Sequence, residues 1–170
     1  MSRSFDDDFS ELFNEHFQRL YRYLDRLAGD PELAADIAQE TFVRLYERKS
    51  LPDAPAAWLV TVAMNLFRNA HSTHQRRRRL LEVVPDAEGF ADRSVPPTHS
   101  IESREIEQRV RRALDGIPER ERQMLLLRAE GYSYRDIAET LGLHESSIGT
   151  LLARAKRAFI EHYEDRADAS

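Results

Sequence analysis

Two stretches of this sequence carry side chains that suit contact with nucleic acid, and the first lies before the middle of the chain. It passes from apolar residues to Asn65, Arg68 and Asn69, and then to four consecutive arginines, Arg76, Arg77, Arg78 and Arg79. Amides hydrogen-bond the edges of bases, and guanidinium groups hold phosphates. A base withdrawn from a duplex also needs polar groups that satisfy its exposed edge. The pattern predicts a DNA site. The alternative is a polar helix end at which the arginine run only provides solubility.

The second stretch, residues 131–159, has the spacing of a helix-turn-helix. Ser133 is placed to cap a short helix. Asp136, three residues later, is placed to accept the reciprocal hydrogen bond of a capping box, and Gly142 ends the helix. A longer helix begins at Glu145, with an inner apolar stripe and the outward basic residues Arg154, Lys156 and Arg157. In this motif the second helix lies in the major groove of DNA. The alternative is an ordinary pair of amphipathic helices in an all-α core.

A third set of polar residues is acidic. Asp36, Gln39 and Glu40 are spaced i, i+3 and i+4, which places them on one helix face, away from Ile37 and Leu45. A solvated surface accounts for such a face. The functional alternative is a docking surface for a basic partner helix.

Hydrophobic periodicity and turn residues predict an all-α fold that positions these three sets. Helices are expected over residues 5–27, 31–48, 56–79, 101–115 and 118–130, followed by the two helices of the helix-turn-helix. The side chains expected inside the third helix are Trp58, Leu59, Val62, Leu66 and Phe67. The period is lost between Val84 and Ser100, where prolines collect. We therefore expect two small helical domains, residues 1–82 and 101–170, joined by a flexible linker over residues 83–100.

Composition limits the kinds of function that remain. The 170 residues include no cysteine, which excludes disulfides and thiolate chemistry, and His71 and His74 lack neighbours that would complete a metal site. No metal and no cofactor is expected. There is no glycine-rich phosphate loop, nucleophile elbow or HExxH helix, so we do not expect an enzyme. No apolar run approaches the roughly 20 residues needed to cross a membrane, and we expect no membrane insertion.

The net charge of -5 is unusual for a protein that binds DNA. Phosphate binding depends on the cations presented locally and not on the total charge. Here the acids gather in the first fifty residues, whereas arginines gather at positions 76–79. Such a chain is expected to bind DNA weakly by itself and to need a partner.

The same residues resemble a known family. The runs PELAADIAQETFVRLYER and PAAWLVTVAMNLFRNAHSTHQRRRR resemble region 2 of bacterial sigma factors, and LDGIPERERQMLLLRAEGYSYRDIAETLGLHESSIGTLLARAKRAF resembles region 4. A short chain with only these regions and a linker resembles the extracytoplasmic-function (ECF) group. The resemblance implies a cytoplasmic bacterial protein, a dissociable subunit of RNA polymerase that directs core enzyme to promoters. A stand-alone helix-turn-helix regulator and a protein-only adaptor are the alternatives.

The resemblance also implies partners and roles for particular residues. Region 2 would bind the β′ clamp and melt the minus-ten element, and region 4 would bind the β flap and read the minus-thirty-five element. Members of the group are often held by an anti-sigma factor, which is a further expected partner. The positions implied are Asp36, Gln39 and Glu40 for core polymerase; Asn65, Arg68, Asn69, Arg76, Arg77, Arg78 and Arg79 for DNA in region 2; and Arg128, Tyr134, Ser146, Ser147, Thr150 and Arg154 for DNA in region 4.

Two positions depart from the family pattern. Gly149 stands where many members have lysine or arginine, and a glycine within a helix costs about 1 kcal/mol relative to alanine. The change removes a side chain suited to guanine, which puts the minus-thirty-five preference in question. His144 stands where serine, threonine or proline often precedes the recognition helix, and it is a poorer cap.

Overall fold

Every secondary-structure element in the described parts of the chain is an α-helix. The computed structural model describes residues 3–81 and 100–165, without the side chains of residues 74, 75, 77–79 and 81. No strand occurs in those two ranges, so the predicted all-α fold is confirmed. The chain divides into two compact units, Met1–Ser94 and Val95–Ser170, each of which is described by itself.

The helices begin and end within two residues of the positions expected from the sequence, except that no end was predicted for the last helix, which runs to Asp165. Unit 1 contains α1 (Phe5–Ala28), α2 (Pro31–Arg48) and α3 (Pro55–Leu81). Unit 2 contains α4 (Ile101–Asp115), α5 (Glu119–Ala129), α6 (Tyr134–Leu141) and α7 (Glu145–Asp165). The linker expected over residues 83–100 lies outside the described residues except for Ser100, whose side chain caps α4 by accepting a hydrogen bond from the Ser103 amide.

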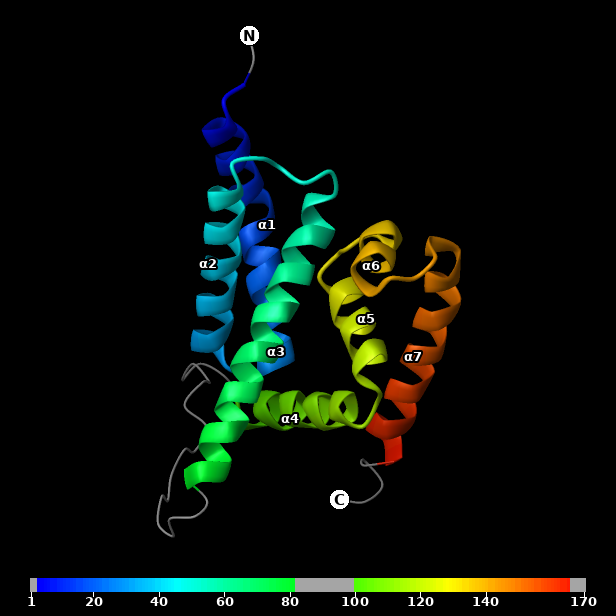
Figure 1. Cartoon of the computed structure of the whole chain (residues 1–170). Coiled ribbons are helices and arrows are strands. Elements are labelled where there is room, and N and C mark those ends of the chain that lie inside the picture. The colour runs from blue at the N-terminus through cyan, green and yellow to red at the C-terminus, as the bar shows by residue number, and fades with distance from the viewer. Residues whose placement is uncertain (1–2, 82–99, 166–170) are drawn as a thin grey trace. The chain divides into compact units, whose positions relative to one another are not determined.

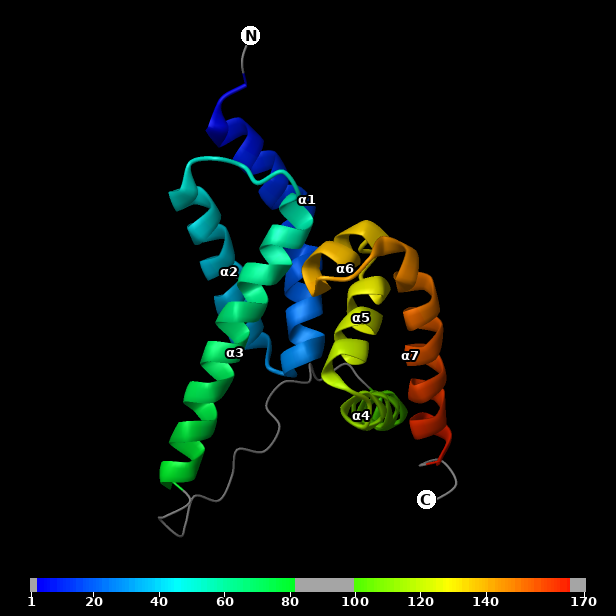
Figure 2. The ribbon, with the colours of Figure 1, turned by 45° about the vertical axis from the view of Figure 1, so that its right-hand side comes forward.

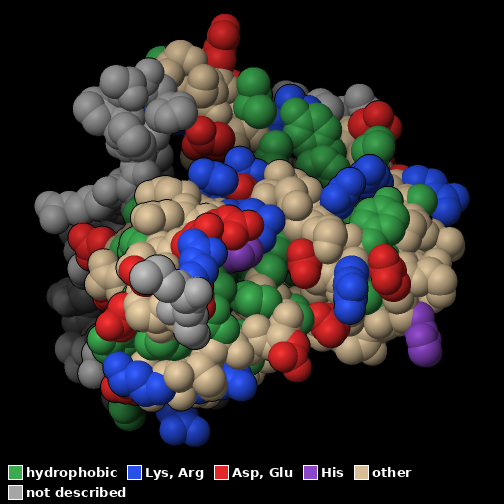
Figure 3. All heavy atoms as spheres, turned by 90° about the horizontal axis from the view of Figure 1, so that it is seen from above, with side chains coloured by type: hydrophobic (Ala, Val, Ile, Leu, Met, Phe, Trp, Pro, Cys, Tyr) green, Lys and Arg blue, Asp and Glu red, His purple; other side chains and the backbone are tan. Residues whose placement is uncertain are grey.

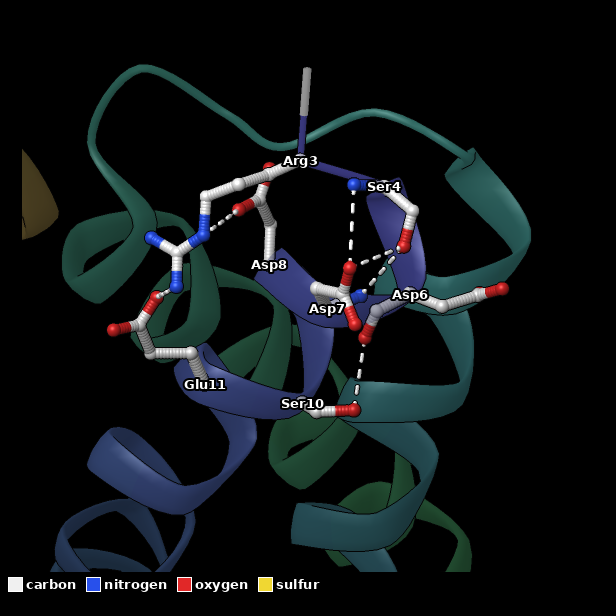
Figure 4. A network of polar contacts seen from close by, with 7 residues as sticks. All are labelled: Arg3, Ser4, Asp6, Asp7, Asp8, Ser10 and Glu11. Atoms are coloured by element: carbon white, nitrogen blue, oxygen red, sulfur yellow. Dashed lines mark hydrogen bonds and ion pairs between the residues drawn. The ribbon is translucent and has the colours of Figure 1, made fainter. Parts of the chain in front are cut away.

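The acidic start of the chain initiates α1 (Figure 4). Ser4 Oγ accepts a 3.2 Å hydrogen bond from the Asp7 amide, and the Asp7 carboxylate accepts one of 3.4 Å from the Ser4 amide. Arg3 bridges one turn of the helix, 3.6 Å from Asp8 and 2.9 Å from Glu11. Negative charge in the first turn also suits the positive end of the helix dipole. Part of the acidity of the first fifty residues therefore supports the fold.

Unit 1 is a bundle in which α2 and α3 both pack against α1, as Figures 1 and 2 show. Its core is mostly aliphatic, with Phe42 and Tyr23 as buried aromatic residues, and the fully buried Tyr23 donates a 3.3 Å hydrogen bond to Met64 Sδ. From α3 the core takes Leu59, Val60, Ala63 and Met64.

An aromatic row closes the contact between α1 and α2. Phe9 and Phe13 meet Phe42 edge to face, with ring centroids 6.3 and 5.0 Å apart, and Phe9 meets Tyr46 at 5.1 Å. Such pairs add about 0.5–1.5 kcal/mol beyond the area that they bury. Lys49 Nζ lies 3.5 Å from the centroid of the Tyr46 ring. The row fixes α2 on α1 and so fixes which face of α2 is left outside.

Unit 2 places the helix-turn-helix on a platform of two further helices. Both ribbon views show α4 crossing α5 and α7 steeply (Figures 1 and 2). The helix α6 begins with the expected capping box of Ser133 and Asp136, and it ends at Gly142 in the left-handed conformation, φ 66°. Ile137, Ile148 and other apolar side chains are buried between α6 and α7. The turn chemistry predicted from the sequence is confirmed.

Gly116, between α4 and α5, lies against His162 of α7, so a larger residue there would meet the imidazole ring. An added Cβ would lie 2.9 Å from His162 Nδ1, although the φ of -79° would accept any residue. We expect Gly116→Ala to lower the free energy of unfolding by about 1–3 kcal/mol through overpacking, measured by urea denaturation. Adding His162→Ala to this variant should restore part of the lost free energy of unfolding.

Gly149→Ala is the matched control for this substitution, because a Cβ there would meet Tyr134 at an ordinary 3.6 Å. It should raise the stability by about 1 kcal/mol, since alanine favours helix. If Gly116→Ala proved as stable as the wild type, His162 would have to move aside at no cost.

Candidate nucleic-acid interface

The acidic residues of α2 lie outward, as their spacing predicted. Asp36, Gln39 and Glu40 are all exposed, while Ile37 and Leu45 are buried on the opposite side of the helix. Glu40 forms an ion pair of 3.2 Å with Arg44 one turn on, with both side chains about half exposed. Such pairs are worth under about 1 kcal/mol, so the carboxylate can exchange Arg44 for another cation.

Val43 belongs to the same face and was missed by the sequence analysis. Its side chain is 48% exposed, and it lies seven residues after Asp36 and three after Glu40. The continuation of the i, i+3, i+4 spacing to i+7 is the signal that would have found it. We call Asp36, Gln39, Glu40 and Val43 the α2 docking face. An exposed valine beside acids suits a partner helix that is basic and partly apolar.

The α3 helix carries the amides and arginines on one side. Asn65, Arg68, Asn69 and Arg76 are all exposed, and the C-terminal end of α3 projects past α1 and α2 in both ribbon views (Figures 1 and 2). The side chains of Arg77, Arg78 and Arg79, expected at the DNA backbone, lie outside the described residues. This side of α3 is therefore a row of exposed polar side chains. We call Asn65, Arg68, Asn69 and Arg76 the polar track.

Asn65 and Arg68 are in contact with each other. Arg68 Nη1 donates a 3.4 Å hydrogen bond to Asn65 Oδ1, a contact that does not use the N–H donors of the Asn65 side chain. Thr61, one turn earlier, is also exposed, and its hydroxyl donates to the Ala57 carbonyl at 2.8 Å. Thr61 was missed by the sequence analysis, although the i−4 spacing from Asn65 would have found it. Together these groups suit the edge of an unpaired base.

His71 stacks on Phe67, with ring centroids 5.7 Å apart, and the side chain of His74 lies outside the described residues. Among the described residues, no group of three or more His, Cys, Asp or Glu side chains is placed to hold a metal ion.

Arg128 and Tyr134, from α5 and α6, form one cluster at the start of the helix-turn-helix. Arg128 Nη1 donates a 3.1 Å hydrogen bond to the Tyr132 carbonyl, and its guanidinium carbon lies 5.1 Å from the centroid of the Tyr134 ring. Tyr134 as a whole is 40% exposed. The cation is thus held by a carbonyl and an aromatic face and is presented at the surface.

The recognition helix α7 exposes most of the residues expected on it. Ser146, Thr150 and Arg154 are exposed, whereas Ser147 is half-buried and its amide donates to the His144 carbonyl at 3.0 Å. The inner side of the helix is formed by Ile148, Leu152 and Ala155, all buried. The exposed face is therefore narrower than the sequence suggested.

Charges are mixed on the face shown in Figure 3, where acidic and basic side chains alternate with apolar ones. Over the described ranges, no helix is long and apolar enough to cross a membrane.

Two family models match the chain. One, described as Sigma-70 region 2, covers residues 12–77, and the other, described as Sigma-70, region 4, covers residues 107–159. The first range contains the α2 docking face and the amides of α3. The second contains the Arg128–Tyr134 cluster and the exposed part of α7.

Curated proteins show the same similarity. The ECF RNA polymerase sigma factor EcfG of Rhodopseudomonas palustris is 34% identical over 141 residues, which are 78% of this chain and 70% of that protein. The ECF RNA polymerase sigma factor SigE of Mycolicibacterium smegmatis is 30% identical over 151 residues, 86% of this chain, and the chain spans 57% of its length.

A solved structure has a similar fold. It is that of the sigma factor RpoE in complex with the anti-sigma factor NepR from Bartonella quintana. The TM-score is 0.66 at 22% identity, with 92% of this chain and 97% of that chain covered. This likeness concerns the fold alone.

Proposed function

Because this chain belongs to the family of ECF RNA polymerase sigma factors, we propose that its two units read the two elements of one promoter while bound to core polymerase. Family membership makes it an alternative sigma factor of transcription initiation and not a stand-alone helix-turn-helix regulator. In the proposal unit 1 melts and reads the minus-ten element, and unit 2 reads the minus-thirty-five element. The catalytic step belongs to the polymerase, in the bacterial cytoplasm.

The observation that carries the proposal is the separation of an acidic face from a polar track within unit 1. The acidic face lies on α2 and consists of Asp36, Gln39, Glu40 and Val43. The polar residues lie on a different helix, α3, and include Asn65 and Arg68. A protein partner can therefore occupy α2 while DNA occupies α3. This supports the β′ clamp as the partner of the α2 docking face, and the β flap is proposed as the partner of unit 2.

The residue roles in DNA binding follow from the chemistry at each position. Asn65, Asn69 and Arg68 receive the unpaired minus-ten bases, and Arg76 to Arg79 hold the duplex backbone upstream. Arg128 and Tyr134 hold phosphates beside the minus-thirty-five element. Ser146, Ser147, Thr150 and Arg154 face the groove, with Ser147 contributing least because it is half-buried. An anti-sigma factor would compete for these surfaces.

Dependence on core polymerase follows from charge. The net charge of -5 opposes binding to a polyanion, and phosphate contacts lose strength steeply with salt. We expect the purified chain to bind promoter DNA at least about tenfold more weakly than the holoenzyme does at physiological salt, because local cations supply the affinity. The chain with core enzyme should start transcription at specific promoters. Gel-shift titration and in vitro transcription on genomic fragments measure the two quantities.

The footprint on DNA separates this proposal from its rival. Two dissimilar protected elements, seen only with polymerase, support the sigma factor. A palindromic footprint of the free protein, with no effect on core transcription, would mean that the chain acts as a dimeric regulator.

A further inference from the structure

The ring of Tyr134 lies across the recognition helix at Gly149. A Cβ built on Gly149 would be 3.6 Å from Tyr134 Cε2, so the ring edge lies beside the place where a side chain would begin. Gly149 lies in the N-terminal part of α7, which in a helix-turn-helix contacts base edges. The first helix of the motif ordinarily crosses the DNA backbone. Its first residue, Tyr134, therefore reaches from the backbone side toward the groove.

One contact holds the ring in that place, and a second contact holds its partner, Arg128. The Arg128 guanidinium lies over the ring face at 5.1 Å and is itself fixed by its hydrogen bond to the Tyr132 carbonyl. Tyr132 is fully buried, so this carbonyl belongs to a rigid part of unit 2. Tyr134 as a whole remains 40% exposed, too much for a residue that only fills the core. It is an ordered aromatic surface beside the base-reading positions.

We propose that Tyr134 is a specificity-determining residue. Its ring contacts the base pair that a lysine or arginine at position 149 would otherwise contact, and it recognises a thymine there. The proposal rests on the function proposed above. A lysine or arginine at position 149 would grip guanine N7 and O6, whereas an aromatic ring has no such donors and packs against the thymine methyl group. The Tyr134 hydroxyl can still donate to a phosphate, which affects affinity at all sequences equally.

The absence of a side chain at Gly149 is what makes this possible. A lysine or arginine there would begin 3.6 Å from Cε2, and in the proposal it would compete with the ring for the same base pair. Alanine would not, because its Cβ meets the ring at van der Waals distance. The two substitutions at one position therefore have opposite predictions for base preference.

The test is transcription by holoenzyme on a promoter library randomised across the minus-thirty-five element, with sequenced transcripts as the readout. The wild type should prefer thymine at one position of the element. Tyr134→Ala should lower that preference about tenfold while other positions keep theirs, the size expected for the discrimination of one base pair. Tyr134→Phe should keep the preference and lose output evenly. Gly149→Ala should keep it, and Gly149→Lys should shift it toward guanine.

The outcomes distinguish this inference from the function beneath it. If the wild type gives no promoter-specific transcript from any library member, the sigma-factor function fails. If it gives specific transcripts but Tyr134→Ala lowers output evenly across all sequences, Tyr134 holds only a phosphate and the inference is overturned. Should Tyr134→Ala fold poorly by circular dichroism, Gly149→Lys decides, because an unchanged preference in that variant also overturns the inference.

Discussion

Replacing Asp36 and Glu40 together with arginine should weaken binding to core polymerase by at least about 100-fold, because like charges brought together at an interface cost several kcal/mol. Both side chains are exposed on α2, and the core of unit 1 lies on the other side of that helix. The fold should survive, since only the exposed ion pair of Glu40 with Arg44 is lost. Fluorescence anisotropy of labelled protein titrated with core enzyme measures the affinity.

The control for this variant carries the same change of net charge elsewhere. Glu11 and Glu15 are exposed on α1, so replacing both with arginine adds equal positive charge to unit 1 and, like the α2 variant, removes one exposed ion pair, that of Glu11 with Arg3. This control should bind core polymerase within a few-fold of the wild type. Equal losses in the two variants would point to a general electrostatic effect, and an unchanged affinity in the α2 variant would remove the α2 docking face from the proposal.

Local signals in the sequence were sufficient to locate the helices. Asp30 caps α2 through the amides of Glu32 and Leu33, with Pro31 at the first helical position, and Ser133 and Gly142 bound α6 as expected. These signals depend on neighbours within about four residues, which the sequence displays directly. The exposure of Asp36, Gln39 and Glu40 was predictable for the same reason.

The core of α3 was predicted less well. Of the residues expected inside, Leu59 is buried, but Trp58, Val62, Leu66 and Phe67 are only half-buried. Val60, Ala63 and Met64 are buried instead. Helical periodicity gives a wide apolar stripe, and the neighbouring helices decide which edge of it is covered. Tyr23 on α1, whose hydroxyl reaches Met64, draws the core toward that edge.

The contact of Tyr134 with Gly149 could not be read from the sequence at all. It joins residues fifteen positions apart across a turn, and it depends on the crossing of α6 and α7. From the sequence Gly149 was only a missing side chain. In the structure a ring from the preceding helix lies beside that position, 3.6 Å from where a Cβ would be, and this supports the proposal that Tyr134 replaces the missing contact.

Replacing Asn65 with alanine should reduce transcription from promoters with a minus-ten element by about 10–100-fold, the loss of one or two hydrogen bonds to a base. Arg68 donates to Asn65 Oδ1, so the asparagine is already oriented, and the variant loses the oriented N–H donors. Affinity for core polymerase should not change, because Asn65 is on α3 and the α2 docking face is intact. Asn14→Ala, at another exposed helical asparagine, is the matched control and should transcribe normally.

A template that is already unpaired across the minus-ten element separates two roles of Asn65. If the residue binds the extruded base, Asn65→Ala stays defective on the unpaired template, because the lost hydrogen bonds are to the base itself. If it acts only in opening the duplex, the unpaired template restores full activity. We expect the first result. The Asn65 amide, held by Arg68, has the donors and acceptors of a base-binding group, and it is not an apolar wedge that could separate base pairs. Full activity of Asn65→Ala on both templates would remove the residue from the site.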